Sequence, residues 1–410
     1  MSGYIIYIFI FFILFGFVFS SILEYLNSKN WNDSIPDVLK DFYKESDYKR
    51  AKNYKIDRDK VSLISSLLST SITIVFIVSG LYGKISDFSI YYFDSLFLQS
   101  AAFFLFFLII STTISLPISY YSVFTIEEKY GFNKTTKITF LKDKIKGLLM
   151  SLIIGGFILF VSIQIYILFG ANFWLWLWLF LSVFLILTNM FYTTLIVPIF
   201  NKLSPLEEGS LKNKIEEYSK KIGYSLDKIF VIDGSKRSSK ANAFFSGLGP
   251  KKTIALFDTL IDKHEEDELV AVLAHEVGHY KKNHIKQGLL LSVLQVGIIC
   301  YILQLCLNET SLSYALGASE SSFHLGLIAF SFLFSPISII IGIGMNILSR
   351  RNEYEADNFA KESFNPESLK NALKKLSSDS LTNLYPHPLY VFVHYSHPPL
   401  LKRLEALDRK

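Results

Sequence analysis

The sequence predicts an all-α integral membrane protein with seven transmembrane helices and a polar domain that contains a small β-sheet. Of the 410 residues, 51% are hydrophobic and 16% are aromatic, and the mean hydropathy is +0.35. Several apolar stretches reach about twenty residues, the length with which an α-helix crosses a bilayer core of about 30 Å. Two long polar segments, 197–286 between apolar stretches and 348–410 after the last one, are predicted to form a separate domain.

Seven stretches have the length and composition of membrane spans. They are residues 3–24, 61–82, 96–120, 147–170, 172–196, 287–307 and 324–347. The first is expected to be a retained helix, because it is longer than the apolar region of a signal peptide and no basic residue precedes it. Pro117 and Pro336 fall inside the third and seventh spans, where membrane helices tolerate them as kinks.

Lysine and arginine alternate between the loops. The segments after the first and third spans are rich in them, with Lys29, Lys40, Lys44, Lys49, Arg50, Lys52, Lys55, Arg58 and Lys60 in the first and Lys129, Lys134, Lys137, Lys142, Lys144 and Lys146 in the second. The segment 83–95 has only Lys84, and 308–323 has none. Because basic loops stay in the cytoplasm, we expect the amino terminus outside and both polar segments inside.

Composition also excludes some classes of partner. The net charge of +5 is small for this length and the basic residues are spread over loops, so no nucleic-acid partner is expected. Cys300 and Cys306 lie in one apolar stretch and cannot build a disulfide framework.

The segment His275-Glu276-Val277-Gly278-His279 matches the pattern HExxH. On a helix, His275 and His279 share one face and can bind one zinc ion, while Glu276 can act as the base toward the catalytic water. A random chain of this length would contain the pattern roughly once in a hundred cases, so two surface histidines on an amphipathic helix are the alternative. The motif predicts a zinc endopeptidase in which Glu276 takes a proton from water and delivers it to the leaving amine.

A tetrahedral zinc site needs a third protein ligand. His284 does not fit the extended motif HExxHxxGxxH, because the third histidine of that pattern would fall at position 285, which is Ile285. We expect His284 to face solvent or a pocket. His279 lies about eight residues before the sixth span and Glu353 about six after the seventh, so both reach a similar depth, about 9 to 12 Å from the apolar edge. Glu353 is therefore the predicted third ligand.

Asp357 shares a helix face with Glu353 and is predicted to accept a hydrogen bond from a ligand histidine, whereas Glu355 points about 200° away. The alternative is an ordinary charged helix end in which Arg350 and Arg351 anchor the topology. With these assignments the chain divides into transmembrane helices 1–5 with their basic loops (1–196), the first part of a peptidase domain (197–286), transmembrane helices 6–7 (287–347) and its second part (348–410).

The rest of the candidate site comes from two further segments. Residues 228–232 and 253–257 are β-prone, and a small sheet with an open edge could bind an extended peptide. The tail offers His394, His397 and Arg403 to stabilise an oxyanion, although Pro398 and Pro399 fit the start of a structural helix equally well. The acidic residues 265–268 suit the amino-terminal end of the motif helix and are interpreted as structural.

Several segments together resemble the type 1 CAAX prenyl proteases over nearly the whole chain. They are Ile126-Glu127-Glu128-Lys129-Tyr130-Gly131-Phe132-Asn133, Gly234-Ser235-Lys236-Arg237-Ser238-Ser239 leading to Asn242-Ala243, Leu256-Phe257-Asp258-Thr259-Leu260, the HExxH motif, Glu353 to Asp357, and Tyr395-Ser396-His397-Pro398-Pro399. The resemblance implies a seven-helix barrel around a large water-filled chamber, capped on the cytoplasmic side by a zinc peptidase domain of the gluzincin type.

It also implies roles for residues. His275, His279 and Glu353 would bind one Zn²⁺ and Glu276 would be the base. His397 and Arg403 would line the site as catalytic residues, and Asn242 and Ala243 would bind substrate. The implied activity is removal of the last three residues from a prenylated carboxyl-terminal CAAX motif, with a peptide or protein substrate and the lipid bilayer as partners.

One local departure concerns substrate preference: Lys240-Ala241 stands where eukaryotic members usually have His-Ser. The alternatives are a quality-control protease for membrane proteins without prenyl dependence, and a transporter or scaffold with a degenerate site that holds no stoichiometric zinc. Abundant Phe, Ile, Lys, Tyr and Asn suit an AT-rich genome, and the chain has no carboxyl-terminal retrieval signal. We therefore expect a bacterial inner membrane rather than the endoplasmic reticulum.

Overall fold

The computed structural model describes residues 2–223, 228–246 and 253–409 and confirms a helical membrane fold with a small sheet. Six helical stretches are long and apolar enough to cross a bilayer, and one of them, Lys137–Phe200, contains two helices separated at Gly170–Asn172. The described residues thus contain the seven expected spans. These are α1 (Ser2–Lys29), α2 (Glu45–Val78), α4 (Leu96–Tyr121), α5 (Lys137–Phe169), α6 (Phe173–Phe191), α11 (His284–Asn308) and α13 (Phe323–Ser363).

The bounds of several spans differ from the prediction, and those of α2 and α13 differ most. Helix α2 was expected over 61–82, but it begins at Glu45 and ends at Val78, because Gly80 adopts a left-handed conformation with φ 64° and separates it from the next helix. Its basic first half is amphipathic: Tyr48, Ala51 and Tyr54 are buried in a cluster that also contains Tyr130 and Phe132 and residues of the carboxyl-terminal part of the chain. Helix α13 continues well beyond residue 347, so a membrane helix runs directly into the polar domain.

Short elements join the spans. They are η1 (Asp37–Leu39), α3 (Leu81–Tyr92), η2 (Ser122–Glu127), η3 (Gly170–Asn172), η4 (Tyr192–Ile196), α7 (Val197–Phe200) and α12 (Ser311–Ala315). At the end far from the polar domain, the Gly83 N–H donates to the Leu316 carbonyl at 2.9 Å. A β-carbon on Gly83 would lie only 2.0 Å from the backbone of Gly317, so this close approach requires glycine.

The polar domain contains a four-stranded sheet in the order β1-β2-β4-β3. The predicted strands β2 (Lys228–Ile232) and β4 (Thr253–Phe257) are present and pair in parallel. Two strands were not predicted: β1 (Leu203–Pro205) pairs antiparallel with β2, and β3 (Ala243–Ser246) pairs antiparallel with β4. Strand β3 therefore forms one edge of the sheet.

Helices complete this domain around a core formed by Leu269, Leu273 and Val277 of the motif helix with Ile254 and Leu256 of β4. They are α8 (Ser210–Lys221), η5 (Gly234–Lys236), α9 (Asp258–Ile261), α10 (Glu266–Lys281), α14 (Pro366–Asp379), α15 (Pro388–His394) and α16 (Leu400–Asp408).

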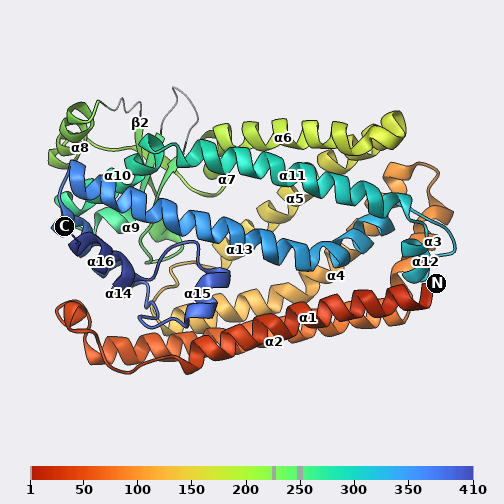
Figure 1. Ribbon diagram of the computed structural model, residues 1–410, viewed down its shortest axis with the longest axis horizontal. Helices are drawn as coiled ribbons and strands as arrows, with labels where there is room; N and C mark the ends of the chain where they lie inside the picture. The colour runs from red at the N-terminus through yellow and green to blue at the C-terminus, as the bar shows by residue number, and fades with distance from the viewer. Residues whose placement is uncertain (1, 224–227, 247–252, 410) are drawn as a thin grey trace.

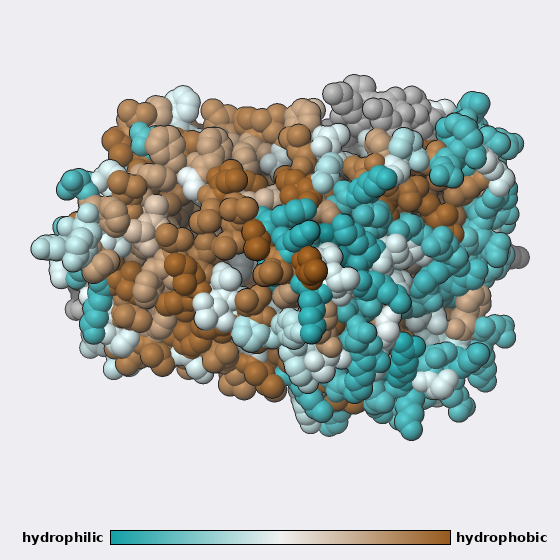
Figure 2. Space-filling model, turned by 180° about the vertical axis from the view of Figure 1, so that it is seen from behind, coloured by the Kyte–Doolittle hydropathy of each residue, from teal (hydrophilic) through white to brown (hydrophobic). Residues whose placement is uncertain are grey.

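The elements form an elongated molecule with the polar domain at one end. In Figure 1, α1 and α2 run along one long side, α6 and α11 run along the other, and α13 lies between them and reaches the polar domain. Helices α4, α5, α6, α11 and α13 line a cavity of about 810 Å³ with mostly apolar walls. Figure 2 shows a broad hydrophobic surface over the long helices and a hydrophilic surface over the polar domain, as a membrane-embedded protein requires.

Candidate metal centre

Helix α10 carries the HExxH motif and begins with a capping box. The Glu265 side chain accepts from the backbone of Glu268, and the Glu268 side chain accepts from the Glu265 N–H at 3.1 Å. Glu266 and Asp267 add negative charge at the positive end of the helix dipole. The acidic cluster thus has the structural role that the sequence indicated.

The motif helix packs closely on α13. A β-carbon on Gly278 would lie 3.0 Å from the Ala356 Cα and 3.1 Å from the Ala356 carbonyl oxygen, and Ala356 is fully buried. Larger side chains at these two positions would hold the helix axes farther apart. The small pair therefore allows the histidines of α10 to meet the carboxylate of α13.

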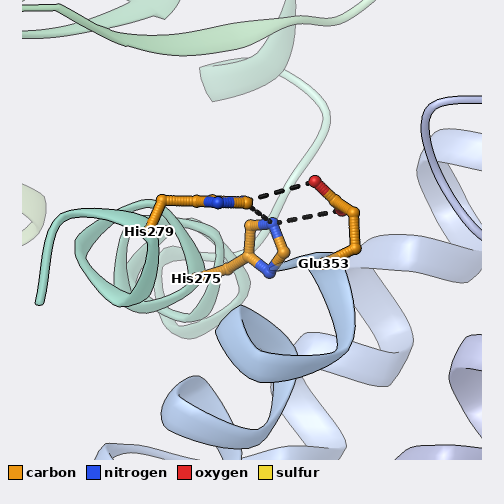
Figure 3. Close-up of side chains that lie close together, drawn as sticks. All are labelled: His275, His279 and Glu353. Carbon is orange, nitrogen blue, oxygen red and sulfur yellow. Dashed lines mark hydrogen bonds and ion pairs between the residues drawn. The ribbon is translucent and has the colours of Figure 1, made fainter. Parts of the chain in front are cut away.

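His275, His279 and Glu353 come together as predicted, with one ligand atom from each within 4.8 Å of the others. The two histidine Nε2 atoms are 3.2 Å apart. The Glu353 carboxylate oxygens lie 3.5 Å from the His275 Nε2 and 3.3 Å from the His279 Nε2 (Figure 3). Two imidazoles of one helix and a carboxylate of another thus converge on one point.

This geometry fits a tetrahedral metal ion. Two nitrogens at about 2.0 to 2.1 Å from a tetrahedral zinc are roughly 3.3 Å apart, close to the observed separations. Glu353 is only 4% exposed, and its Oε2 makes no hydrogen bond to any residue that the structure describes. A buried carboxylate oxygen without a hydrogen bond is costly, and a cation at the centre of the triad would relieve that cost.

Asp357 holds the other side of His275, as the sequence predicted. Its Oδ1 lies 2.9 Å from the His275 Nδ1, and Arg403 donates to both of its carboxylate oxygens at 2.6 and 2.8 Å. Burial alone lowers the pKa of His275, but the interactions of its ring nitrogens with the Asp357 and Glu353 carboxylates outweigh burial and raise that pKa to about 9. Burial also opposes the charge of Arg403, yet Asp357 and Glu353 raise its pKa. The His275 ring is therefore fixed with its Nε2 toward Glu353.

His284 does not face solvent; it lies against the other ligand histidine. It is 5% exposed, and its Nδ1 is 3.1 Å from the His279 Nδ1. Asn283, directly before it, adopts a left-handed conformation with φ 61°, which turns the chain at the end of α10. The expectation rested on the extended motif, which places a third histidine at position 285, and this turn explains why His284 nevertheless lies against His279.

A pocket of about 300 Å³ opens beside the triad and brings together the remaining candidate residues. Glu276, Asn242, Ala243, His397 and Arg403 all line it. The His397 Nε2 lies 3.3 Å from a Glu353 oxygen, and the Arg403 Nη1 lies 3.5 Å from the other. Pro399 precedes the first turn of α16, so the tail is both a helix start and a wall of the pocket.

One wall of the pocket was missed in the sequence. Leu369, Leu373 and Leu376 of α14 line it, together with Leu260 and Val272. The signal was available, because the three leucines recur at helical spacing on an amphipathic segment that begins with an Asn365 cap and Pro366. They give the site an apolar wall for substrate side chains.

Comparison with known proteins identifies the fold and the family. Residues 24–202 match the model of the CAAX prenyl protease N-terminal region with five membrane helices, and residues 205–410 match the model of peptidase family M48. The chain is 36% identical to the CAAX prenyl protease 1 of Saccharomyces cerevisiae, with 96% of this chain and 92% of that protein covered. The chain belongs to peptidase family M48, among the type 1 CAAX prenyl proteases.

Other relatives cover similar lengths. The Dictyostelium discoideum CAAX prenyl protease 1 homolog is 34% identical over 100% of this chain and 98% of its own. The Homo sapiens homolog is 32% identical over 91% of this chain and 88% of its own. The crystal structure of S. mikatae Ste24p superposes with a TM-score of 0.93 at 35% identity and covers 99% of both chains.

Membership of this family makes the chain a multi-pass membrane metallopeptidase and confirms the predicted fold class, a membrane chamber of seven helices joined to a zinc peptidase domain. Membership of a peptidase family also argues against the alternative of a transporter or scaffold. The relatives named above are eukaryotic, so the bacterial inner membrane receives no support from them and stays a prediction, as does the orientation of the chain.

Proposed function

We propose that this peptidase removes the carboxyl-terminal tripeptide from prenylated proteins or peptides that end in a CAAX motif. The observation that carries the proposal is the convergence of His275, His279 and Glu353 in a chain whose full-length relatives are named CAAX prenyl proteases. The position of this triad where a membrane helix enters the polar domain favours a substrate that a lipid group anchors in the bilayer.

We propose one Zn²⁺ per chain, with His275, His279 and Glu353 as its ligands. Two imidazoles and one carboxylate leave a fourth position open, which is the arrangement of catalytic zinc sites. When bound, the metal acidifies water and polarises the scissile carbonyl. Asp357 orients His275 through the contact of 2.9 Å between its Oδ1 and the histidine Nδ1.

Other residues of the pocket are proposed to transfer the proton and to stabilise the oxyanion. Glu276 accepts the proton of the attacking water and then delivers it to the leaving amine. His397 and the Arg403 Nη1 lie near Glu353 and supply an N–H donor and positive charge where the oxyanion develops. Two other donors of Arg403 are held by Asp357, which keeps the guanidinium in place.

The substrate backbone would pair with the edge of the sheet. Strand β3 is bonded to β4 on one side and ends the strand order, so its other side can pair with an extended peptide. The carbonyl of Asn242, just before β3, accepts from the Phe257 N–H at 3.1 Å, which fixes the start of this edge. Asn242 and Ala243 are the proposed substrate-binding residues.

We also propose the division of the chain and its orientation that the sequence predicts. Residues 1–196 and 287–347 form the membrane part, and 197–286 and 348–410 form the peptidase domain on the cytoplasmic side. The loop-charge alternation supports this orientation, since 25–60 and 121–146 are rich in Lys and Arg.

Cleavage assays with purified enzyme test the proposal. Wild type should release the tripeptide from a farnesylated CAAX peptide, a chelator should stop the reaction, and added zinc should restore it. Glu276→Gln should lose cleavage by at least ~100-fold while zinc stays bound, because only the proton acceptor is removed. Glu362→Gln, an exposed carboxylate on α13, is the matched control. Equal cleavage of farnesylated and unfarnesylated peptides would instead favour a quality-control protease.

A further inference from the structure

Three polar side chains, those of His279, His284 and Glu355, form a connected row that leads away from the proposed metal position. The His279 Nδ1 lies 3.1 Å from the Nδ1 of His284, and the His284 Nε2 lies 3.2 Å from a Glu355 carboxylate oxygen. The other oxygen of Glu355 accepts from the Arg351 Nε at 3.0 Å. The middle member is the most enclosed, since the His284 side chain is 4% exposed and that of Glu355 is 37% exposed.

The positions of the protons in this row follow from its two ends. The His279 Nε2 faces Glu353 and His275, so a metal bound there requires the lone pair of that nitrogen. A neutral His279 then carries its proton on Nδ1 and donates it to His284, whose Nδ1 must accept. His284 in turn carries its own proton on Nε2 and donates it to the ionised Glu355.

The two ligand histidines are thus anchored by two carboxylates of one helix in different ways. Asp357 shares the face of α13 with Glu353 and reaches the His275 Nδ1 directly at 2.9 Å. Glu355 points to another side of α13, about 200° from Glu353, and contacts His279 only through an intermediate. His284 is this intermediate, because the left-handed Asn283 places it at the first position of α11.

We propose that His284 is a positioning residue that fixes the tautomer and the ring orientation of His279, with Glu355 as its anchor. This inference rests on the proposed metal site. Partners of this kind typically change metal affinity or activity 10- to 100-fold when they are removed. His284 contacts neither the metal position nor the pocket, so its effect acts through His279.

The experiment measures zinc affinity rather than activity. Purified protein is stripped of metal and titrated with zinc against a chromophoric chelator, and the visible absorption spectrum of the Co²⁺-substituted protein is recorded. His284→Ala should weaken zinc binding by about 10- to 100-fold and change the Co²⁺ spectrum. His284→Asn should bind within a few-fold of wild type, because its side-chain oxygen can still accept from the His279 Nδ1–H.

His264→Ala is the matched control. His264 is equally buried and forms a comparable pair with Glu268, with 3.1 Å between its Nδ1 and the Glu268 Oε2, but it lies at the other end of α10. It should lower thermal stability and leave zinc affinity unchanged. Glu355→Ala should weaken zinc binding less than His284→Ala, because His279 keeps its direct partner.

The outcomes separate this inference from the proposed function. If wild type and His284→Ala bind zinc equally, the positioning role is wrong and the metal site stands. Equal weakening by His264→Ala and His284→Ala would mean a general loss of stability and would also overturn the positioning role. If wild type binds no zinc, the metal site is wrong and the positioning role falls with it.

Discussion

Gly278 of α10 lies directly against Ala356 of α13, and a β-carbon at position 278 would lie 3.0 Å from the Ala356 Cα. This contact lies between the two helices that supply the three ligand atoms. Since the obstructing atoms belong to the backbone of α13, the contact cannot be relieved by a change of rotamer.

A larger residue at position 278 should therefore separate the ligands. Gly278→Leu should abolish stoichiometric zinc binding, because the histidines would move away from Glu353. Gly278→Ala should retain zinc with reduced affinity, since a gain in helix propensity of about 1 kcal/mol opposes the closer contact. Elemental analysis of purified protein measures the zinc content. Gly288→Ala on α11, where a β-carbon meets nothing within 4 Å, is the control, and full zinc content in Gly278→Leu would contradict the packing argument.

The buried pair of Arg403 and Asp357 should show strong coupling. Arg403 is 9% exposed and Asp357 is 2% exposed, so removing either one leaves the other buried charge without its main partner, at a cost of about 3 to 5 kcal/mol. Arg403→Met and Asp357→Leu should each lower the thermal denaturation midpoint more than the double variant does. Additive effects in this cycle would count against the pair.

Lys240 should affect substrate binding more than the metal. Its Nζ lies 2.8 Å from the Tyr54 hydroxyl and 3.0 Å from a Glu127 oxygen, and it lies over the Phe132 ring with 4.2 Å to the centroid. It thereby ties the segment before β3 to α2 and η2. Lys240→Met should raise KM several-fold with little change in zinc content, because the edge strand loses its support.

Kinetics with the farnesylated peptide test this expectation, and Lys236→Met, at an exposed position of the same segment, is the control. A fall in kcat with unchanged KM would assign Lys240 to the chemistry instead of to the support of the strand.

The proposed orientation predicts a labelling pattern in intact cells. Cys300 and Cys306 are buried in α11, so the native chain should react weakly with a membrane-impermeant maleimide. Glu309→Cys, in the loop after α11, should be labelled from outside, whereas Lys49→Cys on α2 should be labelled only after lysis. The reverse pattern would invert the topology.

The convergence of His275, His279 and Glu353 could be predicted from the sequence because it depends on regular geometry. The four-residue spacing puts His275 and His279 on one face of any helix. His279 and Glu353 are separated from the sixth and seventh spans by similar numbers of residues, so uninterrupted helices bring them to a similar depth. The seven spans were also predicted, since length and hydropathy determine them. The assignment of Asp357 followed from the same four-residue spacing.

What could not be predicted depends on local breaks and on tertiary contacts. The contact of His284 with His279 depends on the left-handed Asn283, for which the sequence offered no clear signal. Strand β1 has three residues and β3 has four, too few for a pattern of alternation. The early start of α2 reflects burial of Tyr48 in a cluster with Leu384, more than three hundred residues away, and contact of the Tyr54 ring with Tyr130 and Phe132.

Helix α13 runs without interruption from Phe323 to Ser363 and carries Glu353 on the part that extends beyond its apolar span. Glu353 stands only five residues, about 8 Å, beyond Leu348, the last apolar residue before Arg350 and Arg351. The distance of Glu353 from the membrane surface is therefore set by a continuous helix rather than by a loop. For the proposed substrate, which a lipid group anchors in the bilayer, we therefore expect the cleaved bond to be selected by its distance from the membrane surface.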